Sequence, residues 1–168
     1  MMFRERVLLA SFLVCLTPVL LVFGCAQDGA EKALASGGSD RTMQQVRNAH
    51  RLADEARSLA DQEAALHALQ RAFERYSFGP TEAGLLLRQD LADRSAKLCL
   101  ALRRPQAAFD WTERGLGISR VPSLVRANLL LTKAEALGTL GNESAARGVL
   151  LQALTMNQAL LKKELKDP

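Results

Sequence analysis

Residues that can do chemistry are few in this chain, and their spacing forms no known catalytic pattern. His50 and His67 are the only histidines, and no cysteine lies at metal-ligand spacing from either. Asp54 and Glu55 are adjacent, so on a helix they would point in different directions and could not act as a paired acid and base. No phosphate-binding glycine loop, nucleophile elbow or zinc-protease motif occurs. The sequence therefore predicts neither an enzyme nor a metal or cofactor site.

Cys25 is the residue with the clearest chemical context. An apolar run of 18 residues, 7–24, follows the charged Arg4-Glu5-Arg6 and ends in small residues, which is typical of a secretory signal. The segment Val22-Phe23-Gly24-Cys25 resembles the bacterial lipobox, in which a small residue precedes a cysteine that is lipidated and becomes the mature N-terminus. The resemblance implies a lipoprotein-type signal peptide over 1–24 and acyl chains such as palmitate on Cys25.

The residue after Cys25 indicates a compartment. Lipoproteins of familiar Gram-negative bacteria that stay in the inner membrane favour aspartate there, so Ala26 implies the periplasmic face of the outer membrane. Two alternatives remain open at the sequence level. The run 7–24 is either an uncleaved anchor, or a signal for ordinary secretion with cleavage before Gln27.

The third cysteine has a structural interpretation. Cys15 lies inside the apolar run and Cys25 would be acylated, so Cys99 has no partner for an intramolecular disulfide. A single cysteine in a leucine- and alanine-rich segment is most often a small buried hydrophobe. We therefore expect Cys99 to be buried.

Composition predicts the elements that must position these residues. The 168 residues suit one domain, and 48% of them are apolar but only 5% aromatic. Residues 25–168 contain 25 Ala and 25 Leu, with few β-branched residues, which favours helices over strands. The glycines, serines and charges of 26–40 predict a flexible tether after the lipidated cysteine. The basic residues of 41–168 are scattered, which argues against nucleic acid as a partner.

Helix breakers divide the domain 41–168 at regular intervals. They occur at Gly79-Pro80, Arg104-Pro105, Val121-Pro122 and Gly141-Asn142, with apolar residues at helical spacing between them. Asp61, Thr81 and Asn142 are candidate N-caps, and Pro105 suits a first helical turn. The predicted helices are six in number and cover 42–60, 62–76, 81–103, 105–117, 123–140 and 143–165.

The last predicted hairpin carries a recognisable pattern of small and large residues. The pattern is Ala134-x-x-Leu137-x-x-x-Gly141-x-x-x-x-Ala146-x-x-x-Leu150-x-x-Ala153-Leu154. It resembles the tetratricopeptide repeat (TPR), which places small residues where two helices cross and glycine at the turn. The proline that ends the family pattern is replaced by Gln158.

The same frame fits twice more upstream. One copy contains Ala96, Cys99, Leu102, Ala108 and Leu116, with Arg103 at the turn glycine and Gly115 at a crossing alanine. The first copy contains Ala53, Ala56, Ala60, Ala65, Leu69, Ala72 and Phe73. The resemblance covers residues 46–158 and implies an all-α fold, a right-handed α-solenoid of about three hairpins. The first helices of the hairpins would then line a concave groove that accepts an extended peptide or partner helix.

The family's groove positions map onto three sets of residues in this chain. They are Arg47, His50, Arg51, Asp54 and Arg57; Asp90, Asp93, Arg94 and Lys97; and Asn128, Leu131, Thr132 and Glu135. Such a groove has a basic end that suits acidic or carboxylate groups. A solvated helix face is the competing interpretation. The Lys/Asn set with which chaperone-binding members of this family clamp a C-terminal carboxylate is absent.

Three aromatic residues have two interpretations. Tyr76 and Phe78 precede Pro80 in a predicted loop, and Trp111 lies in a predicted helix. They either form a docking surface or fill the space between hairpins.

The sequence thus predicts a lipid-anchored adaptor that binds an envelope protein. Resemblance to repeat-containing lipoproteins suggests assistance to a pore or pilus, assembly of outer-membrane proteins, or scaffolding of wall enzymes. The alternatives are a self-assembling structural envelope protein and a wall-directed enzyme.

Overall fold

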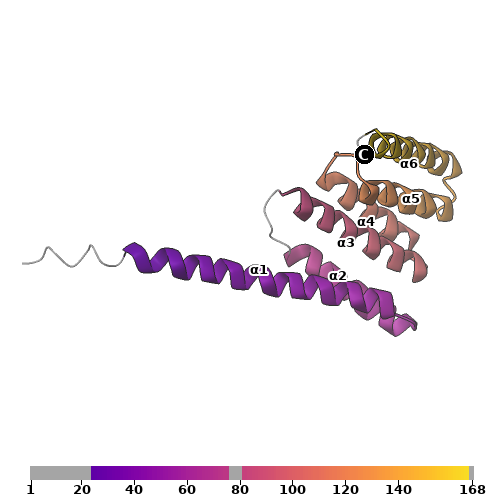
Figure 1. The fold of residues 1–168 in the computed structure, drawn as a ribbon. Helices are drawn as coiled ribbons and strands as arrows, with labels where there is room; N and C mark the ends of the chain where they lie inside the picture. The colour runs from indigo at the N-terminus through magenta and orange to yellow at the C-terminus, as the bar shows by residue number, and fades with distance from the viewer. Residues whose placement is uncertain (1–23, 76–80, 167–168) are drawn as a thin grey trace, which may run out of the picture. The chain divides into compact units, whose positions relative to one another are not determined.

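The computed structural model describes residues 24–75 and 81–166, with side chains from residue 40 onward (Figure 1). These residues form six helices and no strand, which confirms the all-α prediction. The helices are α1 (Gly24–Glu55), α2 (Leu59–Arg75), α3 (Glu82–Ala101), α4 (Pro105–Ile118), α5 (Leu124–Thr139) and α6 (Glu143–Glu164). All but α1 begin and end within a few residues of the predicted positions.

Helix α1 begins much earlier than predicted. It covers residues 26–40, where a flexible tether was expected. Ala26, Ala33, Leu34 and Ala35 are strong helix formers, and extending an existing helix costs less than starting one, which offsets the glycines. The chain divides into two units inside this helix, between Gly37 and Gly38. Both hydrophobic clusters belong to the second unit.

Side-chain caps begin the helices at polar residues. Thr81 Oγ1 accepts a hydrogen bond from the Gly84 N–H, and Asn142 Oδ1 accepts one from the Ala145 N–H, as predicted for both caps. The prediction for Asp61 was wrong, because Ser58 takes the cap position. Ser58 Oγ accepts from the Asp61 N–H, and the Asp61 carboxylate accepts from the Ser58 N–H in return. The Ser58 hydroxyl also donates to the Asp61 carboxylate, and this bond, followed by the one from the Ser58 N–H, lowers the pKa of Asp61.

Two turns end their helices in the same way. Arg103 has φ 57° and Gly141 has φ 81°, so both lie in the left-handed region. After α3 the Arg104 N–H bonds to the Cys99 carbonyl, and after α5 the Asn142 N–H bonds to the Leu137 carbonyl. This is the Schellman arrangement, in which a left-handed residue lets the last carbonyls find donors. The two left-handed residues lie 38 positions apart, as do Ala96 and Ala134 at equivalent positions of the second and third predicted repeats.

Helices α2 to α6 pack in chain order. Each contacts the next, and α3 also contacts α5 across the α3–α4 hairpin (Figure 1). Gly115 of α4 permits a close approach at this centre. A Cβ added there would lie 2.9 Å from the Ala92 Cβ of α3 and 2.9 Å from the methyl carbons of Leu129 in α5. The repeat pattern has alanine where two helices cross, and this close approach explains why residue 115 is glycine instead.

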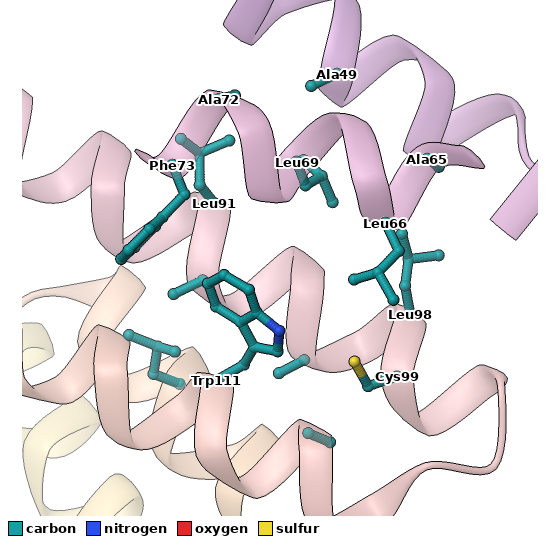
Figure 2. Close-up of a cluster of buried hydrophobic side chains, with 14 of the residues drawn as sticks. Ala49, Ala65, Leu66, Leu69, Ala72, Phe73, Leu91, Leu98, Cys99 and Trp111 are labelled. Carbon is teal, nitrogen blue, oxygen red and sulfur yellow. The ribbon is translucent and has the colours of Figure 1, made fainter. Parts of the chain in front are cut away.

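The larger hydrophobic cluster draws on α1 to α5 (Figure 2). Leu69 and Leu91 are fully buried in it, and the Phe73 and Trp111 rings meet edge to face with centroids 5.2 Å apart. The smaller cluster joins α5 and α6 through Leu130, Ala134, Leu137, Ala146, Val149 and Ala153. Phe109 packs against both clusters and so connects them.

The end of α4 is capped by its neighbours. Gln89 of α3 is fully buried and donates through Nε2 to the carbonyls of Gly115 and Ser119. The Arg126 guanidinium of α5 donates to the carbonyls of Leu116 and Ser119. A cation at a helix C-terminus also complements the helix dipole. These bonds tie α4 to the helices before and after it.

Candidate partner-binding face

The face predicted to bind a partner is built on α1, α3 and α5. Val46 and Ala49 are buried on the inner side of α1. Because residues three and four apart share a helix face, this burial places His50 and Asp54 beside α3. Contacts between predicted site residues then link α1 to α3 and α3 to α5.

Four of these residues form a charged network between α1 and α3. His50 Nδ1 lies 3.5 Å from Asp90 Oδ2, and Arg94 Nε lies 3.3 Å from the same oxygen. Arg94 Nη1 donates to Asp54 Oδ1 at 2.6 Å. Both carboxylates thus have a cationic partner on this face, and Arg94 bridges them.

The pKa of His50 is lowered from its ordinary value. Burial is the larger cause and the neighbouring Arg94 guanidinium is the second, while Asp90 and Asp54 act in the opposite direction. His50 is therefore neutral at neutral pH. Its ring serves as a polar packing group between the helices rather than as a fixed charge.

A second connection joins α3 to α5. Asp93 is buried, its Oδ1 accepts a 2.6 Å hydrogen bond from Thr132 Oγ1, and Lys97 Nζ lies 2.7 Å from its Oδ2. Buried carboxylates need such partners because an unpaired buried charge is costly. Asp93 and Thr132 are thus structural partners, and only Lys97 extends into solvent.

The remaining predicted residues are exposed on this side of the molecule. Arg51 hydrogen-bonds Glu55 and Asn48 of its own helix. Leu131 is 42% exposed in α5. The other predicted residues on this side are also exposed, and none of them forms a side-chain ion pair with a described residue. They are Arg47, Arg57, Asn128 and Glu135.

A shallow basic cleft follows the outer surface of α1. Its volume is ≈ 520 Å³, and it is lined by Arg41, Gln44, Gln45, Arg47, Asn48 and Arg51. Guanidinium and amide groups on one surface can donate several hydrogen bonds to a carboxylate or phosphate. The chemistry available here is anion recognition.

The structure separates the predicted site residues into two groups. Asp54, Asp93, Arg94 and Lys97 bind one another or nearby helices, and Arg47, Asn128, Leu131 and Glu135 face solvent. The sequence analysis placed both groups on one surface but predicted that all of these residues could bind a partner. Family positions specify which side of a helix a residue occupies, whereas the pairing depends on distances between helices.

The other candidates have structural roles or lie outside the described side chains. Cys99 is 1% exposed, as predicted, and burial raises the pKa of its thiol to about 11. Trp111 is buried against Phe73, which favours the space-filling interpretation. Tyr76 and Phe78 lie outside the described residues. Cys25 is the second residue of α1, and its side chain lies outside the described part.

Two features of the surface were not anticipated. The Arg88 and Arg114 guanidinium carbons lie 5.1 and 4.9 Å from the Phe73 ring centroid, and that of Arg114 lies 4.1 Å from the Trp111 centroid. Helix α6 exposes a series of leucines, and Leu165 at its C-cap is 74% exposed. The spacing of these leucines was visible in the sequence, but only the position of α5 shows which of them remain uncovered.

Comparisons of the chain with protein-family models, curated proteins and solved structures found no match. Among the described residues, no three histidine, cysteine or acidic side chains gather where they could hold a metal ion. Within the same residues, no helix combines the length and apolarity needed to cross a bilayer. Of the run 7–24, only Gly24 belongs to this range.

Proposed function

We propose that the protein is a lipid-anchored envelope adaptor that binds an anionic, extended segment of a protein partner on the face of α1, α3 and α5. The observation that carries this proposal is the pair of links across the face. Asp54 of α1 meets Arg94 of α3, and Asp93 of α3 meets Thr132 of α5. Alternate helices therefore adjoin, as the first helices of a TPR-like array would.

The two Schellman turns support a repeated architecture. Arg103 and Gly141 occupy equivalent turn positions, and each is followed by the same backbone hydrogen bond. We infer a right-handed solenoid of about three TPR-like hairpins, α1–α2, α3–α4 and α5–α6. In this arrangement the second helices form the opposite surface.

The charges of the face favour an anionic partner. Each of the acidic groups has a cationic partner, because Arg94 pairs with both Asp54 and Asp90 and Lys97 pairs with Asp93. The cleft on α1 adds Arg41 and Arg47, neither of which forms an ion pair with a described residue. An extended segment would place its carboxylates on α1 and its apolar side chains toward Leu131.

Affinity capture from membranes tests the binding face. The Arg47/Arg51/Arg57→Ala variant should lose the envelope protein that the parent chain retains. The matched control is Arg71/Arg75/Arg120→Ala, which removes three exposed arginines elsewhere and should retain it. Equal retention by both variants, or no specific protein on the parent, would contradict the adaptor proposal.

The anchor is tested separately. If Cys25 is acylated and holds the protein on the periplasmic face of the outer membrane, labelled fatty acid should appear on the parent chain. The label should vanish with Cys25→Ala and persist with Cys99→Ala. Label that survives Cys25→Ala would remove the lipoprotein part of the proposal and leave the binding face intact.

A further inference from the structure

We propose that α6 pairs with α6 of a second copy in antiparallel orientation, through a stripe of exposed leucines. The stripe consists of Leu150, Leu154, Leu161 and Leu165, which are 46%, 54%, 61% and 74% exposed. Among helices α2 to α6, α6 contacts α5 only. The leucines therefore lie beside the covered side of α6, on a part that no other helix of this group reaches.

The stripe is narrow and consists of two leucine pairs on one side of the helix. At 3.6 residues per turn, its four leucines fall within roughly 60° of one another around the helix axis. Contiguous apolar patches of this kind mark interaction surfaces more often than single exposed leucines do. Leu151 continues the patch sideways into a shallow apolar groove of ≈ 430 Å³ that Pro122 and Met156 also line.

The spacing of the leucines selects a second copy as the occupant. The four leucines of the stripe are separated by 4, 7 and 4 residues, a series that is identical when read in either direction, whereas Leu151 and Leu160 lie to either side of it. An interface with two-fold symmetry requires such self-complementarity, because residue i of one copy meets residue j of the other and the reverse. Antiparallel α6 helices would match Leu150 with Leu165 and Leu154 with Leu161. An unrelated partner would not require this symmetry.

Polar residues at the centre and end of α6 support the same register. Asn157 and Gln158 lie at the midpoint of the stripe, where each would face the other across the two-fold axis. Amide side chains at such a position specify register and orientation in paired helices. Lys162 and Lys163 lie in the last turn. A parallel pair would bring these lysines together, whereas an antiparallel pair separates them by most of the helix length.

The size of the surface predicts a reversible dimer. A helix of 22 residues is about 33 Å long, and one side of it is smaller than the ~800 Å² that a standard interface buries on each partner. We therefore expect the pair to dissociate on dilution. In the envelope, pairing would join two partner-binding faces in one assembly, whatever the partner is.

Cysteine cross-linking of the full chain in mild detergent tests the geometry. Gln158→Cys lies near the two-fold axis and should give, on oxidation, several-fold more disulfide dimer than the parent chain. Leu150→Cys should remain at the parent level, because its two copies would be about 22 Å apart. Mixing Leu150→Cys with a differently tagged Leu165→Cys chain should restore cross-linking. The parent supplies the background from Cys15, Cys25 and Cys99.

Two results would overturn the proposal. If Leu150→Cys cross-links to a second copy of itself as efficiently as Gln158→Cys does, the two helices are parallel. Cross-linking at the parent level in every variant would mean that the stripe does not bind a second copy.

Sedimentation gives an independent measurement that needs no introduced cysteine. Leu161→Lys should sediment with half the mass of the parent at the same protein concentration. Leu59→Lys changes a leucine of similar exposure in α2 and should keep the dimer mass. Equal masses for the two variants at all concentrations would contradict the inference. Neither experiment depends on the partner-binding face, so each can fail without affecting the proposed function.

Discussion

Helices α3 and α6 are both rich in leucine and alanine, yet they distribute polarity in opposite ways. Helix α3 buries Gln89, Asp93 and Ser95. Helix α6 buries only Ala146, Val149 and Ala153, and exposes four leucines, with a fifth at its C-cap. The difference follows from their neighbours, since α3 contacts α2, α4 and α5, whereas α6 contacts α5 alone among α2 to α6. Residue type alone therefore does not indicate which side of a helix is covered.

The buried polar groups of α3 are accommodated by specific hydrogen bonds. Gln89 donates to carbonyls at the end of α4, Ser95 donates to the Leu91 carbonyl, and Asp93 accepts from Thr132. Satisfied polar groups of this kind fix how helices align. The exposed leucines of α6 have no such internal role, which leaves them available for an external one.

The largest expected difference between the two helices concerns leucine truncation. Leu91→Ala removes a fully buried side chain and should lower the free energy of unfolding by about 2–5 kcal/mol. Leu161→Ala removes a side chain that is 61% exposed and should change it by less than about 0.5 kcal/mol, measured at concentrations where the protein is monomeric. Urea denaturation measures both, and equal losses would refute the contrast.

Replacing glycine by alanine should lower the stability of the protein at Gly115, which packs against α3, and raise it at Gly148 of α6. Gly115→Ala puts a methyl group 2.9 Å from Ala92 of α3 and should destabilise the protein by about 1–3 kcal/mol. Gly148→Ala in α6 meets nothing within 4 Å, and alanine is the better helix former, so a gain of up to ~1 kcal/mol is expected. The sign of the change in melting temperature distinguishes the two effects. A lower melting temperature for Gly148→Ala would mean that this surface of α6 is covered.

Two threonines provide a matched pair for hydrogen bonding. Thr132→Val leaves buried Asp93 without its Thr132 donor and should cost about 1–3 kcal/mol. Thr155 of α6 is exposed and bonds only the Leu151 carbonyl of its own helix, so Thr155→Val should cost little. Comparable losses in chemical denaturation would mean that the Asp93–Thr132 bond contributes no more than a local one.

The smallest expected effect is a pH dependence from His50, which faces Asp90 of α3. Its pKa is lowered in the folded protein, so the stability it contributes is present above the ordinary value of 6.5 and is lost as the pH falls through the lowered pKa. His50→Gln should flatten the unfolding free energy against pH below 6.5, relative to the parent. His67→Gln, which changes an exposed histidine, is the control. An unchanged slope in His50→Gln would contradict the burial effect.

Much of the fold was predictable because its signals are local. Proline at 105, glycine at 141 and the caps at Thr81 and Asn142 act within a few residues, so five helices were placed nearly correctly. The start of α1 was not predicted, because the glycines of 26–40 indicate a flexible segment whereas its alanines favour a helix, and the prediction followed the glycines. The cap of α2 was missed because Ser58 and Asp61 share one capping box, and Ser58 comes first.

The candidate site was predictable only in outline. The predicted repeat frame placed these residues on the helices that the structure forms as α1, α3 and α5. It did not reveal that Asp93 is buried beneath Thr132, or that Arg94 reaches Asp54. Such pairs join residues about 40 positions apart, and their formation depends on the separation of helices to within an ångström or so.

The amino-acid sequence by itself determined the helical class, the positions of the breaks and the spacing of Leu150, Leu154, Leu161 and Leu165. These are consequences of short-range backbone preferences and of residue order. Only the tertiary structure decided which polar groups are consumed inside the protein and which leucines remain outside. That division depends on which side of each helix has a neighbour, and a neighbour is supplied by residues distant in the chain.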